Sequence, residues 1–128
     1  PLVYRGRGNG SYRNWKQGEK VWVDAVPMGC TLIHGKLLQA MYEASEYYVV
    51  GGERVKRVFE TPREVHFDPV TGSFISKQGT EDFFWCDRVI KEGWLKKLGY
   101  KKVMNKKYPF ICDTAINCGH IDMTGRIY

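Results

Sequence analysis

Long apolar runs are missing from this chain of 128 residues. A helix that crosses a bilayer needs roughly 20 consecutive apolar residues, and no stretch approaches that length. No charged-then-apolar leader opens the sequence, so we expect a soluble, cytoplasmic protein without a membrane span. The first residue is Pro1 rather than Met, which suggests either a processed product or a fragment of a longer protein.

Cysteine is also scarce, and its spacing argues against two common uses. The four cysteines are Cys30, Cys86, Cys112 and Cys118, and none of them forms the CxxC pair that zinc sites favour. Four is few for a domain held together by disulfides. We therefore expect free and mostly buried thiols.

What the chain does contain is enough apolar material for one modest core. Hydrophobic residues make up 43% of the sequence and aromatic residues 14%, well above the level of disordered segments. The length fits one domain. Residues 1–20 are rich in Gly, Arg, Asn and Ser and predict a flexible or joining arm, which leaves residues 21–128 as the domain.

Hydrophobic spacing predicts both strands and helices in that domain. Alternation over residues 21–26 and a short apolar run at 30–33 indicate two strands, and residues 37–42 follow with helical spacing up to about Ala44. The turn signal Asp-Pro-Val-Thr-Gly at 68–72 joins two strand-like pieces into a hairpin.

A second helix is predicted over residues 81–92. Thr80 can cap it, Glu81 and Asp82 suit its positive N-terminal end, and Gly93 marks its end. Short strands are expected at 108–112 and 115–118. Together these elements predict an α/β or α+β fold with a small mixed sheet, two main helices and an irregular hairpin region. The expected buried stripe of the second helix consists of Phe83, Cys86, Ile90 and Trp94.

The positive charge of the chain is local. Lys and Arg number 20 against 14 for Asp and Glu. Much of the excess lies in Lys96, Lys97, Lys101, Lys102, Lys106 and Lys107. Such a cluster is compatible with a solvated loop, and also with a surface that meets nucleic acid, an anionic membrane or a phosphorylated substrate.

Four segments carry a more specific pattern: VDAVPMGCTLI at 23–33, TEDFFWC at 80–86, FICDT at 110–114 and CGH at 118–120. In this order they resemble the C-terminal, acceptor-side half of nucleotide-sugar glycosyltransferases with the A-type fold, a large family of inverting polysaccharide and glycan synthases. The likeness runs from about Val21 to about Ile121. Residues 47–62 and 94–108 depart from it and look inserted.

The resemblance implies that Asp82 is the catalytic base and that Glu81 accompanies it. An alcohol attacks an anomeric carbon well only as its proton leaves, and a placed base contributes about 10²–10⁴-fold. The alternative is that both carboxylates only satisfy the helix dipole. Gly29 and Cys30 correspond to the turn near the meeting point of donor and acceptor, although Gly29 also fits a plain turn. Trp85, or its neighbour Phe84, is placed to stack on a sugar.

His120 matches the position that, in many members, completes a divalent metal site begun by an upstream Asp-x-Asp. The chain has no Asp-x-Asp and no Gly-rich phosphate loop after a strand. We therefore expect Mg²⁺ or Mn²⁺ in the complete enzyme and no metal on this chain alone. The expected partners are a nucleotide sugar and an acceptor glycan, with the missing N-terminal half or a second copy supplying the rest.

Two other classes remain open from the residues alone. One is a basic nucleic-acid-binding module, in which Arg5, Arg7, Arg13 and the lysines hold phosphates while aromatic residues stack on bases. The other is a degenerate transferase-like fold that only binds glycans. Both lack catalysis, and either would leave Asp82 without a chemical role.

Overall fold

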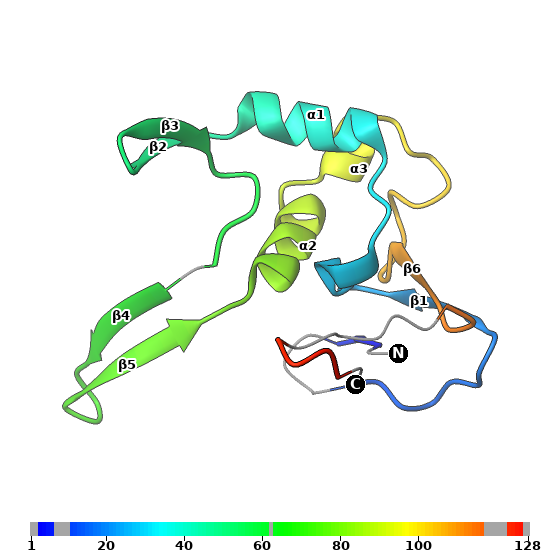
Figure 1. Cartoon of the computed structure of the whole chain (residues 1–128), viewed down its shortest axis with the longest axis horizontal. Coiled ribbons are helices and arrows are strands. Elements are labelled where there is room, and N and C mark those ends of the chain that lie inside the picture. The colour runs from blue at the N-terminus through cyan, green and yellow to red at the C-terminus, as the bar shows by residue number, and fades with distance from the viewer. Residues whose placement is uncertain (1–2, 7–10, 62, 117–122, 127–128) are drawn as a thin grey trace.

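The computed structural model describes residues 3–6, 11–61, 63–116 and 123–126. This part of the chain is mixed, as the sequence predicts, and contains three α-helices and three small antiparallel sheets (Figure 1). The helices are α1 (Gly35–Ala44), α2 (Glu81–Lys91) and α3 (Trp94–Lys97), and a short 3₁₀ helix spans Met28–Cys30. The strands are β1 (Lys20–Val23), β2 (Tyr47–Val50), β3 (Glu53–Lys56), β4 (Arg63–Asp68), β5 (Ser73–Gln78) and β6 (Phe110–Asp113).

The expectation of one mixed sheet is wrong for the described residues. Each sheet has two antiparallel strands, in the pairs β1–β6, β2–β3 and β4–β5. Two of these pairs are local hairpins, whereas β1 and β6 come from opposite ends of the chain and pair Val23 with Phe110. The β1–β6 pair and helices α1, α2 and α3 form what we call the body.

The core lies in the body. Val23, Met41, Cys86 and Val89 are fully buried there, because β1, α1 and α2 each turn an apolar stripe inward. The N-terminal residues also take part, since Val3 is 1% exposed and its carbonyl accepts a hydrogen bond from the Tyr12 amide at 2.8 Å. The division into an arm at 1–20 and a domain at 21–128 stays a prediction.

Helix α2 begins at Glu81, as the sequence predicts, and ends at Lys91, one residue before the predicted end at Glu92. Glu81 and Asp82 occupy its first turn, and Arg88 and Lys91 its last, so both ends complement the helix dipole. Gly93 has a positive φ of 70°, the left-handed conformation that commonly follows a helix C-terminus. The hydroxyl oxygen of Thr80 accepts no capping hydrogen bond from the amides of the first turn, although this residue is the N-cap.

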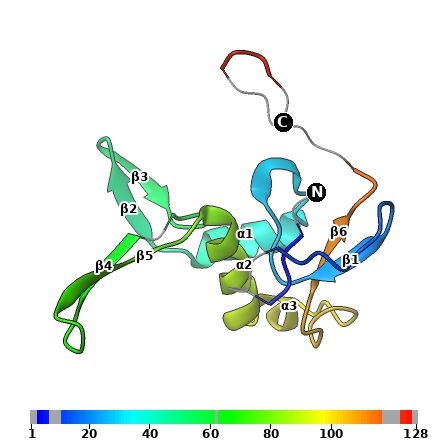
Figure 2. The same ribbon diagram turned by 90° about the horizontal axis from the view of Figure 1, so that it is seen from below.

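Two hairpins project from the body on the same side, away from the β1–β6 pair (Figures 1 and 2). The β2–β3 turn uses Gly51 and Gly52, both at positive φ. The β4–β5 hairpin is confirmed at the predicted turn, where the Asp68 carboxylate accepts hydrogen bonds from the Val70 amide at 2.9 Å and the Thr71 hydroxyl at 2.8 Å. These bonds lower the pKa of Asp68, the Thr71 bond contributing most.

Several predicted elements differ from the structure. The strand expected at 30–33 is absent, because a 3₁₀ turn at Met28–Cys30 leads through extended chain directly into α1. The first strand ends at Val23 instead of Val26. Ala115 lies in a turn and Ile116 is in no strand, and the other half of the strand expected at 115–118 falls outside the described residues. The basic connection at 94–108 contains α3 and a series of turns.

In the described part of the chain, no helix combines the length and apolar character that crossing a membrane requires.

Candidate functional site

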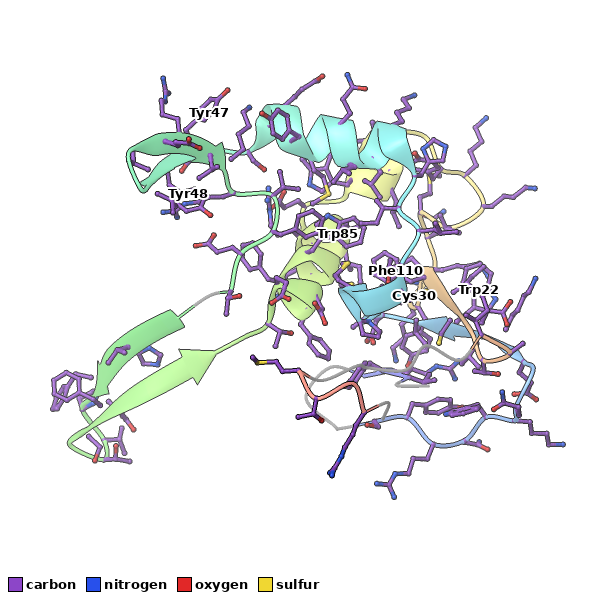
Figure 3. The ribbon with its side chains drawn as sticks, in the orientation of Figure 1. Trp22, Cys30, Tyr47, Tyr48, Trp85 and Phe110 are labelled. Carbon is purple, nitrogen blue, oxygen red and sulfur yellow. The ribbon has the colours of Figure 1, made fainter. Side chains whose placement is uncertain are left out.

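Three of the segments singled out in the sequence meet in the body. The Sγ atom of Cys86 in α2 lies 4.0 Å from the carbonyl oxygen of Val26. The rings of Trp85 and Phe110 have centroids 6.0 Å apart, and Phe110 is also the strand partner of Val23. Figure 3 shows Trp85 between α1 and the β1–β6 pair, with Phe110 beyond it. The segments at 23–33, 80–86 and 110–114 therefore surround one small core.

The acidic pair lies at the start of α2, outside that core. Glu81 is exposed, and its Oε2 accepts a hydrogen bond of 3.3 Å from the Thr61 hydroxyl. Asp82 is half-buried, and no hydrogen bond or ion pair joins it to another described residue. Negative charge is favoured in the first turn of a helix. The carboxylate of Asp82 thus lies on the first turn of α2 without a partner among the described residues.

Gly29 and Cys30 lie in the 3₁₀ turn that follows the first motif, and both are exposed. The turn is closed by a 2.5 Å hydrogen bond from the Thr31 hydroxyl to the Pro27 carbonyl. A Cβ added at Gly29 would have no atom within 4 Å, so no part of the described chain requires glycine here.

Trp85 is a core residue in this structure. Its side chain is 2% exposed and lies between Phe59, with ring centroids 6.1 Å apart, and Phe110. The stripe of α2 accordingly contains Trp85 and Val89, which the predicted stripe omitted. A sugar therefore cannot stack on Trp85 in this structure, because neither face of its ring is exposed. Its neighbour Phe84 is half-buried, with the Arg88 guanidinium 5.8 Å from its ring centre.

The metal residue proposed from the sequence, His120, lies outside the described residues. Among the described ones, no three His, Cys, Asp or Glu side chains come together as a metal site would need. The described residues therefore do not fit a Mg²⁺ or Mn²⁺ site. Asp113, near the end of the third motif, has a structural role, since its Oδ1 accepts a hydrogen bond from the Ala115 amide at 3.0 Å.

Sequence reasoning passed over Asp24, a carboxylate buried to 7% exposure directly after β1. Its Oδ2 accepts a hydrogen bond of 2.9 Å from the Gly6 amide, which ties the N-terminal residues to the body. Its Oδ1 is buried without a hydrogen-bond partner among the described residues. The sequence did carry a signal for this residue, since Asp24 stands between two apolar positions, Val23 and Ala25. An acid in such a place is buried with them, and a buried carboxylate needs hydrogen-bond partners.

The cysteine side chains differ in burial more than the sequence predicts. Cys86 is buried as predicted, Cys112 is half-buried, and Cys30 is exposed. Burial raises the pKa of the Cys112 thiol, and the negative charge of Asp113 raises it further. Cys30 and Cys112 are free thiols, whereas Cys118 lies outside the described residues.

The described structure thus joins three of the four motif segments around one core, with Asp82 at their edge. It leaves the CGH segment at 118–120 outside the described residues, so the expected proximity of Asp82 and His120 stays a prediction. In comparisons with known proteins, no family model, curated protein or solved structure matched the chain.

Proposed function

We propose that this chain is the acceptor-side half of an inverting nucleotide-sugar glycosyltransferase, in which Asp82 is the catalytic base. The donor is a nucleotide sugar, the acceptor is a glycan hydroxyl, and the reaction takes place in the cytoplasm. The nucleotide-binding half comes from sequence beyond this chain or from another subunit. The proposal rests on the resemblance of the four motif segments and on one structural observation.

That observation is the convergence of three motif segments. The link between Cys86 and Val26 joins the second motif to the first, and the contact between Trp85 and Phe110 joins it to the third. Residues placed far apart in the sequence but held by one core can form a common site. This arrangement supports a site at the start of α2, because that is where the motif carries polar residues out of the core.

Asp82 suits the role of base better than Glu81. The Glu81 carboxylate already accepts a hydrogen bond from Thr61, whereas Asp82 has no such bond to a described residue. A base must reach the attacking hydroxyl within about 2.6–3.2 Å, and the Asp82 carboxylate can do so without breaking a contact to any described residue. In the proposed reaction, Asp82 takes the acceptor proton while the acceptor oxygen bonds to the anomeric carbon.

The leaving nucleoside diphosphate departs from the opposite face of the sugar, which gives inversion. A divalent metal, where one is bound, neutralises charge on that diphosphate. Because the described residues do not fit such a site, its ligands belong to the other half, with His120 as the one candidate from this chain. No step assigned to Asp82 depends on the metal.

Replacement of Asp82 by Asn in the full-length protein tests the proposal, since Asn keeps the shape and removes the base. We expect turnover to fall by about two orders of magnitude or more, with donor binding nearly unchanged. Glu81→Gln is the matched control and should lose far less. The readout is release of the nucleoside diphosphate across a panel of nucleotide sugars. Equal turnover in Asp82→Asn and the unmodified protein would assign the base to another residue.

The isolated chain of 128 residues provides a second test. Because it has no phosphate loop and no Asp-x-Asp, we expect neither transfer nor tight binding of a nucleotide sugar in calorimetry. Micromolar binding would show that the donor site lies within this chain. Binding of a glycan without turnover in the full-length protein would instead support a non-catalytic glycan-binding module.

A further inference from the structure

The lysine segment, defined here as residues 94–112, holds the entire net charge of the protein. It contains six lysines and no Asp, Glu or Arg, while the remaining residues carry equal numbers of positive and negative side chains. The lysines occur as three adjacent pairs, 96–97, 101–102 and 106–107, separated by three residues each time. Because the rest of the chain balances to zero and this one segment carries +6, the charge of the molecule is strongly asymmetric along its sequence.

All six lysines are exposed, and the segment is fixed to the body by its aromatic residues. Trp94 is buried, and the Tyr100 hydroxyl lies 2.9 Å from Nδ1 of His34, just before α1. Residues 99–103 line a shallow, open depression that includes Lys101 and Lys102. The lysines are therefore presented on an anchored surface.

Their charge is poorly compensated within the protein. No carboxylate among the described residues forms an ion pair with any lysine of the segment. The Arg88 hydrogen bond is the main cause of the lowered pKa of Glu92, and the charge of Lys97 makes only a minor contribution. Neighbouring positive charges repel each other, so an anionic surface placed opposite them would be attracted strongly at low salt.

The chemistry of the segment favours a diffuse anionic surface over a defined phosphate pocket or a stacked base. Lysine is a hydrated point charge without the planar fork with which arginine binds one phosphate in two places. The nearby rings are already covered by cations: Lys106 Nζ lies 3.9 Å from the Trp22 ring centre. Tyr108 has Arg5 at 4.8 Å and Lys107 at 5.3 Å. Base stacking on single-stranded nucleic acid needs free ring faces, and a cation would have to leave first.

We propose that the lysine segment docks the protein on a membrane surface rich in anionic phospholipids. Clusters of four to eight basic residues bind such surfaces through their summed charge. The segment follows α2 at its C-terminal end, whereas Glu81 and Asp82 lie at the N-terminal end. An 11-residue helix is about 16 Å long, and Figure 1 shows α3 at the end of α2 remote from β5. Docking through the lysines leaves the acidic pair clear of the lipid, and it does not depend on the transfer reaction.

Flotation of the purified chain with lipid vesicles tests this proposal. Vesicles of phosphatidylcholine alone are compared with vesicles containing about 30% phosphatidylserine, at low and high salt. We expect binding to the anionic vesicles only, with strong weakening as salt rises, because the attraction is screened. Each lysine near the surface contributes about fivefold in affinity, from roughly 1 kcal/mol per charge.

The variant Lys101→Gln with Lys102→Gln removes one exposed pair, and Lys16→Gln with Lys36→Gln removes the same charge from exposed positions elsewhere. We expect about a tenfold or greater loss of vesicle binding in the first double variant and less than threefold in the second. Circular dichroism checks that both fold. The proposal is overturned by absent binding to anionic vesicles at low salt, or by equal losses in the two variants. It is also overturned if duplex DNA at the same phosphate concentration binds more tightly than the vesicles.

Discussion

The body and the two hairpins are stabilised by different kinds of interaction. The four hairpin strands contribute no buried side chain among those described, whereas β1, α1 and α2 supply Val23, Met41 and Val89, which are fully buried. The hairpins instead expose large apolar residues, including Val49 at 69% and Phe74 at 76%. Tertiary packing thus holds the body together, and turn chemistry with cross-strand pairs holds the hairpins.

The difference shows where a reaction geometry can be maintained. A side chain on α2 is positioned by a core that includes Trp85 and Cys86, so its place is fixed to within the tolerance of packing. On β4 and β5, the described side chains Phe67 and Phe74 contact each other across the paired strands and lie outside the core. The acidic pair at the start of α2 belongs to the body in this respect, although the β4–β5 hairpin leads directly into it.

The largest effect on stability is expected for Trp85→Ala. This substitution empties a site between Phe59 and Phe110 in the centre of the body, and such truncations lower the free energy of unfolding by about 3–5 kcal/mol. Urea denaturation followed by circular dichroism measures the change. A loss below about 1 kcal/mol would mean that the body is no better packed than the hairpins, and the contrast between them would fail.

An intermediate effect is expected for Arg88→Met, at the junction of the body and the β2–β3 hairpin. Arg88 donates hydrogen bonds to the Arg57 carbonyl at 2.7 Å and to the Ser45 hydroxyl at 3.2 Å, and it pairs with Glu92 at 2.8 Å. The Glu92 side chain is 38% exposed, so solvent screens that pair. We expect a loss of about 1–2 kcal/mol in the free energy of unfolding, measured as for Trp85→Ala. Lys91→Met, which removes a pair on the exposed side of the same helix, is the control and should lose less.

The same variant gives a pH test of the junction. The Arg88 hydrogen bond is the main cause of the lowered pKa of Glu92. A carboxyl with a lowered folded-state pKa stabilises the protein above its unfolded pKa, and that stability is lost as pH falls through the folded value. The difference in stability between the unmodified protein and Arg88→Met should therefore shrink as the pH is lowered through and below the usual glutamate range. A difference that grows towards acid pH would contradict this cause.

The smallest effect is expected for Phe74→Ala in the β4–β5 hairpin. Phe74 makes an edge-to-face contact with Phe67, at 5.4 Å between ring centroids, and such cross-strand pairs contribute about 0.2–1 kcal/mol. Thermal unfolding of the whole chain should hardly change, while hydrogen exchange at the hairpin amides should become faster. A loss as large as that of Trp85→Ala would show that the hairpin packs against a partner in solution.

Sequence patterns were most informative where local chemistry decides the structure. Asp68 and Gly72 correctly predicted the β4–β5 turn, because side-chain hydrogen bonds and a positive φ act within a few residues. The acidic first turn and Gly93 likewise marked both ends of α2. The strand predicted at residues 30–33 is wrong, since a short apolar run is equally compatible with extended chain that has no strand partner.

The candidate site was harder to predict because it depends on contacts between distant segments. The position of Asp82 followed from the motif and the helix pattern. The burial of Trp85 did not, since the side of α2 that faces the core is decided by Phe110 and Phe59, which lie far from it in the sequence. The hydrogen bond from the Gly6 amide to Asp24 could not be predicted either, because Gly6 belongs to an N-terminal segment whose sequence shows no regular spacing.

The pairing of β1 with β6 has a consequence for the order in which the protein folds. The β2–β3 and β4–β5 hairpins close over a few residues and can form within microseconds. The β1–β6 pair forms only when Val23 meets Phe110. Contacts between such distant residues form slowly, because a long loop has to close first. During synthesis, β1 therefore stays without its partner strand until β6 has left the ribosome. A chain that stops before Phe110 keeps both hairpin sequences and loses the strand pair that closes the body.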